Sequence, residues 1–152
     1  MSLCLKCGLC CDGTMFQVVP VTAEEATRLD GKVELTADRT RLVQGCRALA
    51  GCKCGVYLER PEVCRTFKCL VLASLDDGKV TEVEAHEAID EVLARRTLVA
   101  SLLGVEDVHH AVKLARQQVG AGTASEEVSD ALRRLRQALL VMQLQPSDSF
   151  FK

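Results

Sequence analysis

Near its N-terminus the chain carries Cys4-Leu5-Lys6-Cys7-Gly8-Leu9-Cys10-Cys11, and this stretch decides how the N-terminal part can fold. The other five of its nine cysteines are Cys46, Cys52, Cys54, Cys64 and Cys69, and none follows Cys69. Thiolates at short spacing are typical ligands of zinc and of iron–sulfur clusters, because soft sulfur prefers such ions to hard cations. The sequence therefore predicts a metal-binding N-terminal half.

Two other uses of clustered cysteines have less support. An odd number of cysteines leaves one unpaired in a disulfide scaffold, and the first residues do not form a secretory signal. A thioredoxin-like site needs its C-x-x-C motif between a strand and a helix, and no strand is predicted before Cys4. We therefore expect reduced thiols and a cytoplasmic protein.

Composition narrows the class of protein further. The chain has 152 residues, a net charge of −2 and only 3% aromatic residues, with no Trp. A segment with so few large side chains can be stabilised by a metal instead of by apolar burial, since binding of a structural zinc supplies about 10–16 kcal/mol of folding free energy. No basic stripe predicts nucleic-acid binding, and no apolar run approaches the ~20 residues that span a bilayer.

The predicted fold is mainly α, with an irregular, metal-stapled, Cys-rich half at residues 1–75 and a helical half at residues 76–152. In the first half we expect a short strand at 16–21 and a helix that starts at the capping box of Thr22 and Glu25. A further helix with Pro61 in its first turn would carry Cys64 and Cys69. Five residues correspond to about 140° on a helix, so those two thiols bind different ions or the helix is broken.

Glycines and neighbouring thiols indicate how the cysteines are used. Gly8 follows Cys7 and Gly55 follows Cys54, where a positive φ would turn backbone N–H groups toward sulfur. Side chains of adjacent residues diverge, so Cys10 and Cys11 are expected to serve different sites.

Three helices are expected in the second half. The first runs from a capping box at Thr81 to Gly104, the second covers about 106–119, and the third runs from near Ser125 to before Pro146. Their apolar residues are predicted to form packing faces, namely Val83, Val92, Leu93, Val99, Leu102 and Leu103 on the first and Val128, Leu132, Leu135, Leu139 and Met142 on the third. These helices pack on the first half or bind a protein partner.

The cysteine pattern resembles that of the bacterial YkgJ-type cysteine-cluster family, a zinc- or iron-chelating domain. The likeness rests on CxxCGxCC at the N-terminus and on Cys54-x-x-Tyr57-x-x-Arg60-Pro61-x-x-Cys64-Arg65-x-Phe67-x-Cys69. It implies eight metal ligands, which are Cys4, Cys7, Cys10, Cys11, Cys46, Cys54, Cys64 and Cys69. Cys52 falls outside the pattern and is treated as supernumerary, although it could replace Cys54. Arg60 and Arg65 bracket Cys64 and are expected to donate hydrogen bonds to sulfur.

The leading hypothesis is a metal-binding protein that holds zinc at two all-cysteine sites in a structural or regulatory role. The alternative is an iron–sulfur protein, because C-x2-C-x2-C spacing suits a [4Fe–4S] cluster. Such a protein would act in redox chemistry or as part of an enzyme, and flagellin lysine N-methylases look like larger relatives. No catalytic motif is visible in the sequence.

Overall fold

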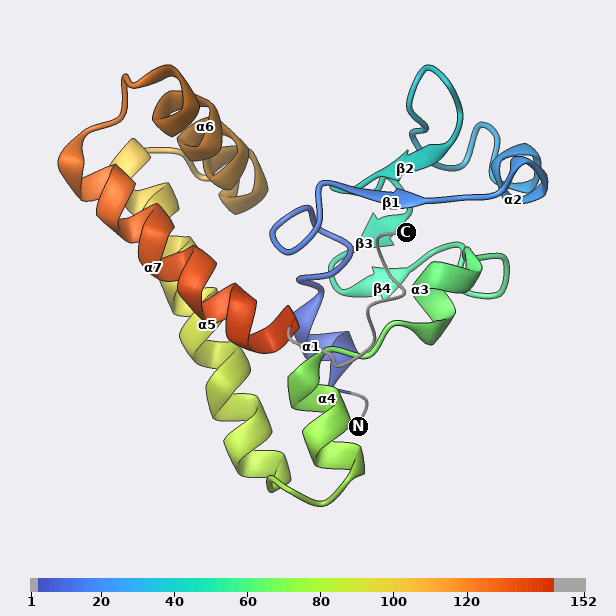
Figure 1. Cartoon of the computed structure of the whole chain (residues 1–152), viewed down its shortest axis with the longest axis horizontal. Helices are drawn as coiled ribbons and strands as arrows, with labels where there is room; N and C mark the ends of the chain where they lie inside the picture. Colours follow the sequence, from blue (N-terminus) through green and yellow to red (C-terminus); the bar gives the residue numbers. More distant parts are fainter. Residues whose placement is uncertain (1–2, 144–152) are drawn as a thin grey trace. The chain divides into compact units, whose positions relative to one another are not determined.

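A computed structural model describes residues 3–143, and the chain divides into two compact units between Lys68 and Cys69 (Figure 1). The boundary predicted from the sequence lay between residues 75 and 76. Each unit is described separately below.

The first unit contains short helices and two small antiparallel sheets. Its elements are α1 (Cys4–Cys7), β1 (Val18–Pro20), α2 (Ala23–Arg28), β2 (Arg41–Val43), β3 (Leu49–Ala50), β4 (Lys53–Cys54) and α3 (Glu62–Thr66). Strand β1 pairs with β2, placing Val19 opposite Leu42, and β3 pairs with β4 through a two-residue turn. The unit is therefore mostly loops and turns, as predicted for the Cys-rich half.

A small apolar core holds these loops together. Val19, Leu29, Val33 and Leu42 are buried in one cluster, and the partly buried Cys46 and Cys64 pack against it. Phe16 and Phe67 meet edge to face with ring centroids 5.0 Å apart. Two thiols predicted to bind metal thus adjoin the core.

The predicted capping box starts α2. The Oγ1 atom of Thr22 accepts a hydrogen bond from the Glu25 amide at 3.2 Å, and the Glu25 carboxylate accepts one from the Thr22 amide at 2.9 Å. The other Glu25 oxygen accepts from the Glu62 amide at 2.8 Å. Partial burial opposes ionisation of Glu25, but these donors outweigh it and lower its pKa. Glu25 therefore links α2 to the start of α3, the helix that carries Cys64.

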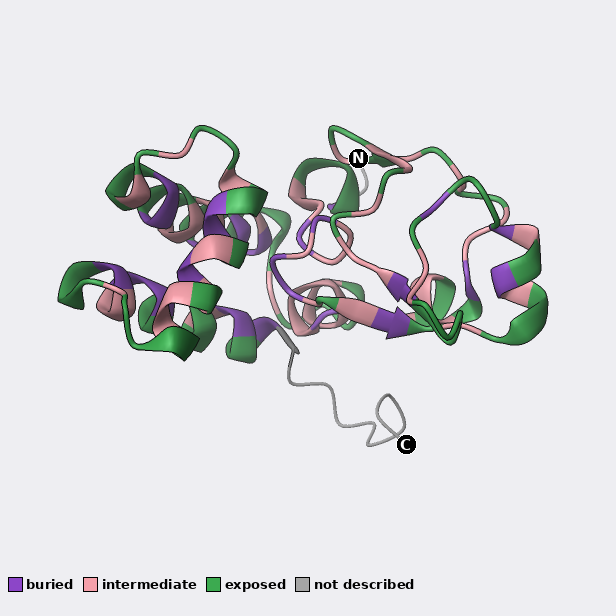
Figure 2. Ribbon diagram, turned by 90° about the horizontal axis from the view of Figure 1, so that it is seen from above, coloured by how far each residue is buried: buried purple, intermediate pink, exposed green. Residues whose placement is uncertain are grey.

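The second unit is a helical bundle of α4 (Leu70–Asp76), α5 (Glu82–Leu103), α6 (Val108–Ala121) and α7 (Glu126–Gln143). Helix α5 packs against the other three, and buried residues recur along the helices (Figure 2). All five apolar residues predicted for the third helix are buried in α7, as are Ala85, Ile89, Val92, Val99 and Ala100 in α5. No helix within residues 3–143 is long and apolar enough to cross a membrane.

The predicted fold class, mainly α with a Cys-rich N-terminal half and a helical C-terminal half, is confirmed. One detail was wrong. Val83 and Leu102 were assigned to the packing face of α5, but they are 66% and 42% exposed, and small alanines occupy that face instead. Of the two alternatives for Cys64 and Cys69, the structure shows the broken helix, because Phe67 adopts an extended conformation and ends α3. Cys69 instead caps α4, its sulfur accepting from the Leu72 amide at 3.5 Å.

Candidate metal centre

Four cysteines from four segments of the first unit lie near one another, and two of them, Cys46 and Cys64, pack against its core. The four are Cys11 after α1, Cys46 before β3, Cys54 in β4 and Cys64 in α3. Their proximity is visible in their ionisation, because negative charge on Cys64, Cys54 and Cys46 raises the pKa of Cys11. The same effect of Cys54 and Cys46 acts on Cys64. We call these four side chains the Cys11 cluster.

Burial raises the pKa of three thiols of the Cys11 cluster, Cys11, Cys46 and Cys64, and repulsion from neighbouring thiolates adds to this effect. Desolvation is the larger cause and the neighbouring thiols the next, and together they raise the pKa of Cys11 to about 12 and that of Cys64 to about 11. The pKa of Cys46 is raised by burial, although a hydrogen bond from the Ala48 amide works against the rise. A divalent cation would relieve this repulsion between thiolates.

Backbone hydrogen bonds hold the segments of the Cys11 cluster in place. The carbonyl oxygen of Cys11 accepts from the amides of Gly45 at 3.2 Å and Cys46 at 3.1 Å. The Gly55 amide donates to the Ala48 carbonyl at 2.7 Å, which closes the hairpin of β3 and β4 beside Cys54. Cys64 follows the buried Pro61 at the start of α3. Residues distant in sequence are thus fixed next to one another.

The two glycines that follow cysteines have different roles. Gly8 has a φ of 65°, as expected, and caps α1. Gly55 has no positive φ, so the expected parallel with Gly8 was wrong. A Cβ atom on Gly55 would lie 3.0 Å from the Ala48 carbonyl oxygen, and this close approach is what requires a glycine.

The two arginines beside Cys64 are placed differently. The Arg60 guanidinium lies over the Tyr57 ring, 3.8 Å from its centroid, and its positive charge favours the Cys64 thiolate. The buried Nε of Arg60 has no hydrogen-bond partner among the residues that the structure describes. Arg65 donates to the carbonyls of Arg60 at 3.1 Å and Leu58 at 3.3 Å. The Nε–H group of Arg60 is therefore available to a further acceptor. The hydrogen bonds of Arg65 instead stabilise the loop before α3.

The remaining five cysteines lie outside the Cys11 cluster. Cys4 and Cys7 lie on α1, and the Cys10 thiol is 3.9 Å from the Met15 sulfur. Cys52 lies at the tip of the β3–β4 hairpin, with its sulfur 3.4 Å from the Lys6 carbonyl oxygen. Cys69 belongs to the second unit. Cys10 and Cys11 thus direct their thiols to different neighbours.

The donor set of the Cys11 cluster fits a soft metal, although its thiols are not drawn into a coordination shell. Across residues 3–143, no three or more His, Cys, Asp or Glu side chains already have the arrangement of a metal site. The four thiols still lie near enough to affect one another's ionisation. A bound zinc ion would draw them into tetrahedral coordination as they deprotonate.

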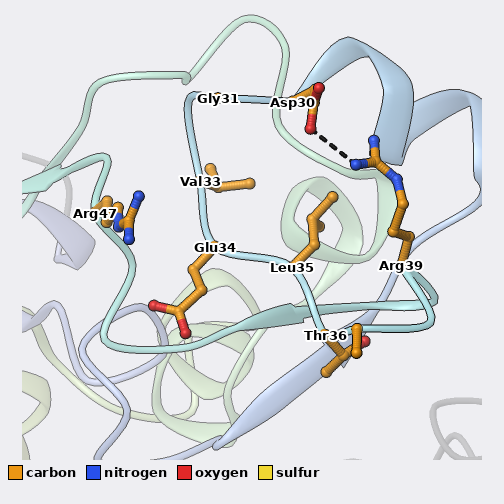
Figure 3. Close-up of a pocket in the computed structure, with 9 residues that line it drawn as sticks. Asp30, Gly31, Val33, Glu34, Leu35, Thr36, Arg39 and Arg47 are labelled. Atoms are coloured by element: carbon orange, nitrogen blue, oxygen red, sulfur yellow. Dashed lines mark hydrogen bonds and ion pairs between the residues drawn. The ribbon is translucent and has the colours of Figure 1, made fainter.

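A shallow cavity on the first unit has different chemistry. It has a volume of about 450 Å³ and is lined by residues 30–31, 33–37, 39 and 47. Figure 3 shows Asp30 paired with Arg39, whose guanidinium is 2.9 Å from the carboxylate. Arg39 has a φ of 56° and also donates to the Ala26 carbonyl at 3.1 Å, which holds this unusual conformation in place. No cysteine lines the cavity, so it is not the metal centre.

Comparison with protein families agrees with the thiol cluster. Residues 3–92, more than half of the chain, match the CxxCxxCC family, described as a "putative zinc- or iron-chelating domain". The chain belongs to this family. Comparison with curated proteins gave no match, and neither did comparison with solved structures. The match includes all nine cysteines and extends into α5.

The sequence left open which thiols share a site. The structure places Cys11 near Cys46, Cys54 and Cys64, which lie far along the chain. The divergence of Cys10 and Cys11 was the only signal that separated them. The Ala48 amide next to the Cys46 sulfur had no sequence signal, because every residue type except proline supplies a backbone N–H there.

Proposed function

We propose that this protein binds zinc at all-cysteine sites and that the Cys11 cluster is one of them. The observation that carries the proposal is the proximity of four thiols from four segments of the first unit, two of which pack against its core. Zinc takes four thiolates in structural sites, with Zn–S bonds of about 2.3 Å. The metal would link α3, β4, the loop before β3 and the turn after α1, which supports a structural role.

Two groups near the sulfurs support the same proposal. The Ala48 amide donates to the Cys46 sulfur, and the unpartnered Nε of Arg60 lies on the residue whose charge favours the Cys64 thiolate. Donors of this kind offset the negative charge of a four-thiolate zinc site and orient its ligands.

We propose a second zinc for the thiols of α1, in line with two sites per chain. Cys4 and Cys7 are separated by one helical turn and therefore lie on one face. Cys10 follows in the same unit, whereas Cys69 stays a prediction of the sequence pattern alone. Cytoplasmic localisation, which suits reduced thiols, and a protein partner for the C-terminal helices are also retained as proposals.

An iron–sulfur cluster is the second candidate, and one observation favours it. Cys4, Cys7 and Cys10 have the C-x2-C-x2-C spacing of [4Fe–4S] ligands. Anaerobic purification distinguishes the two, because an iron–sulfur protein is brown and a zinc protein is colourless. Elemental analysis of the same sample should give about two zinc ions per chain if the first proposal is right.

The Cys64→Ser variant tests the Cys11 cluster directly. We expect it to lose about one zinc ion per chain, since a hydroxyl is a poor ligand for a soft metal site. Thr66→Ala is the matched control, because Thr66 is exposed on the same helix and its hydroxyl donates only to the Glu62 carbonyl. Equal metal content in both variants, or less than one metal of any kind in the wild type, would contradict the proposal.

A further inference from the structure

The ninth cysteine, Cys52, occupies an unusual position at a hairpin tip. The turn between β3 and β4 consists of Gly51 and Cys52, and only Gly51 has a positive φ, as in a type II′ turn. The second position of such a turn does not require a cysteine. Yet Cys52 is partly buried rather than exposed at the tip. A contact of the Cys52 side chain therefore explains both why a cysteine occupies this position and why it is partly buried.

The Cys52 sulfur lies against the residues on both sides of Cys7. It is 3.4 Å from the Lys6 carbonyl oxygen, and a Cβ atom on Gly8 would come within 3.3 Å of it. Gly8 is thus the residue that lets the hairpin tip approach α1. These contacts bring a third thiol to the helix that carries Cys4 and Cys7.

The hairpin also separates its two cysteines. Cys54 contributes to the Cys11 cluster, where its charge affects Cys11, Cys46 and Cys64. Cys52 is absent from those interactions and contacts α1 instead. One short hairpin thereby supplies a thiol to each of two places in the first unit.

We propose that Cys52 is a zinc ligand of the α1 site, where it acts together with Cys4 and Cys7. The inference rests on the proposed zinc binding and names a ligand outside the eight-cysteine pattern. The Cys52 sulfur contacts the backbone on both sides of Cys7. Within residues 3–143 no three such side chains already have the arrangement of a metal site, so the ion would draw the three sulfurs together as it binds. On this assignment Cys52 is not a substitute for Cys54. On binding, Cys52 loses its thiol proton to solvent, so its contact with the Lys6 carbonyl belongs to the metal-free form.

Alkylation of individual cysteines in the full chain tests this, with Zn²⁺ as the probe under anaerobic, reducing conditions. Peptide mass spectrometry gives the modification rate of each cysteine with and without zinc. We expect zinc to protect Cys52 together with Cys4 and Cys7. In Cys52→Ser, whose hydroxyl can keep the contact with Lys6, zinc protection of Cys4 and Cys7 should fall at least about tenfold. Protection of the Cys11 cluster should be unchanged.

Ala50→Ser is the matched control, because it alters an exposed residue of the same hairpin without removing a thiol. Undiminished protection of Cys4 and Cys7 in Cys52→Ser would overturn the inference. If that variant fails to fold, the measurement on the wild type is sufficient. A Cys52 that stays freely reactive while zinc protects the Cys11 cluster would overturn the inference but not the proposed function. Zinc that protects no cysteine would instead refute the proposed function.

Discussion

Single residues set how closely the segments of the first unit approach one another. Gly55 and Gly8 both allow contacts that a side chain would block, but for different reasons. Gly8 needs a positive φ, whereas Gly55 needs only the space between its Cα and the Ala48 carbonyl. Because Cys54 precedes Gly55, a shift here would move a thiol of the Cys11 cluster.

Gly55→Ala should therefore weaken zinc binding and destabilise the first unit by about 1–3 kcal/mol through overpacking. The matched variant is Gly120→Ala in α6, because Gly120 also lacks a positive φ and has open space around its Cα. That change should stabilise the second unit by up to about 1 kcal/mol through helix propensity. Chelator competition gives the zinc affinity and urea unfolding the stability. Wild-type zinc affinity in Gly55→Ala would show that the hairpin tolerates the added methyl group.

At the scale of elements, caps fix where the helices begin. Thr81 and Glu84 form the predicted capping box of α5, and Ser125 Oγ accepts from the Val128 amide at 3.2 Å before α7. Helix α6 begins at Asp107, whose Oδ1 accepts from the amides of His109 at 2.9 Å and His110 at 3.1 Å. These donors, that of His110 first, lower the Asp107 pKa against the opposing effect of partial burial.

Asp107→Ala should lower the free energy of unfolding of the helices by about 1 kcal/mol at pH 7. Because the folded-state pKa is depressed, the ionised cap stabilises α6 above the ordinary pKa of 3.8. That contribution is lost as the pH falls through the lower folded-state pKa. Urea unfolding followed by helical circular dichroism at pH 7 and at pH 2–3 measures the difference.

Asp107→Asn is the control for charge, since it keeps a capping oxygen but does not ionise. It should stay within a few tenths of a kcal/mol of the wild type in acid. An Asp107→Ala penalty that is equally large at both pH values would show that ionisation of this cap is unimportant.

At the scale of the whole molecule, the two units depend on different forces. The bundle of α4–α7 buries continuous apolar faces, including Ile89, Val112, Leu132 and Leu135. The first unit has short elements and a small core on which two thiols pack. The free energy of metal binding is therefore expected to matter for the first unit and much less for the second.

Removal of metal with a strong chelator should consequently unfold the first unit selectively. Helical circular dichroism should largely survive, while limited proteolysis should find new cleavage sites between Asp12 and Lys68. Zinc added back should restore protection, which controls for damage by the chelator. Complete loss of the helical signal would mean that both units fold as one cooperative body.

The sequence by itself determined the local features of this protein. The cysteine spacing predicted soft-metal chemistry, and the boxes at Thr22 and Thr81 located two helix starts, because caps depend on residues only a few positions apart. The heptad-like spacing of Val128 to Met142 predicted the buried face of α7 for the same reason.

Only the tertiary structure decided which thiols meet. Cys11 joins Cys46, Cys54 and Cys64 because hydrogen bonds to its carbonyl and the pairing of β3 with β4 bring distant segments together. The exposure of Val83 likewise depends on neighbours that periodicity cannot supply. The chemical type of a ligand follows from the identity of the residue. Which ligands share a site depends instead on the long-range contacts of the folded chain.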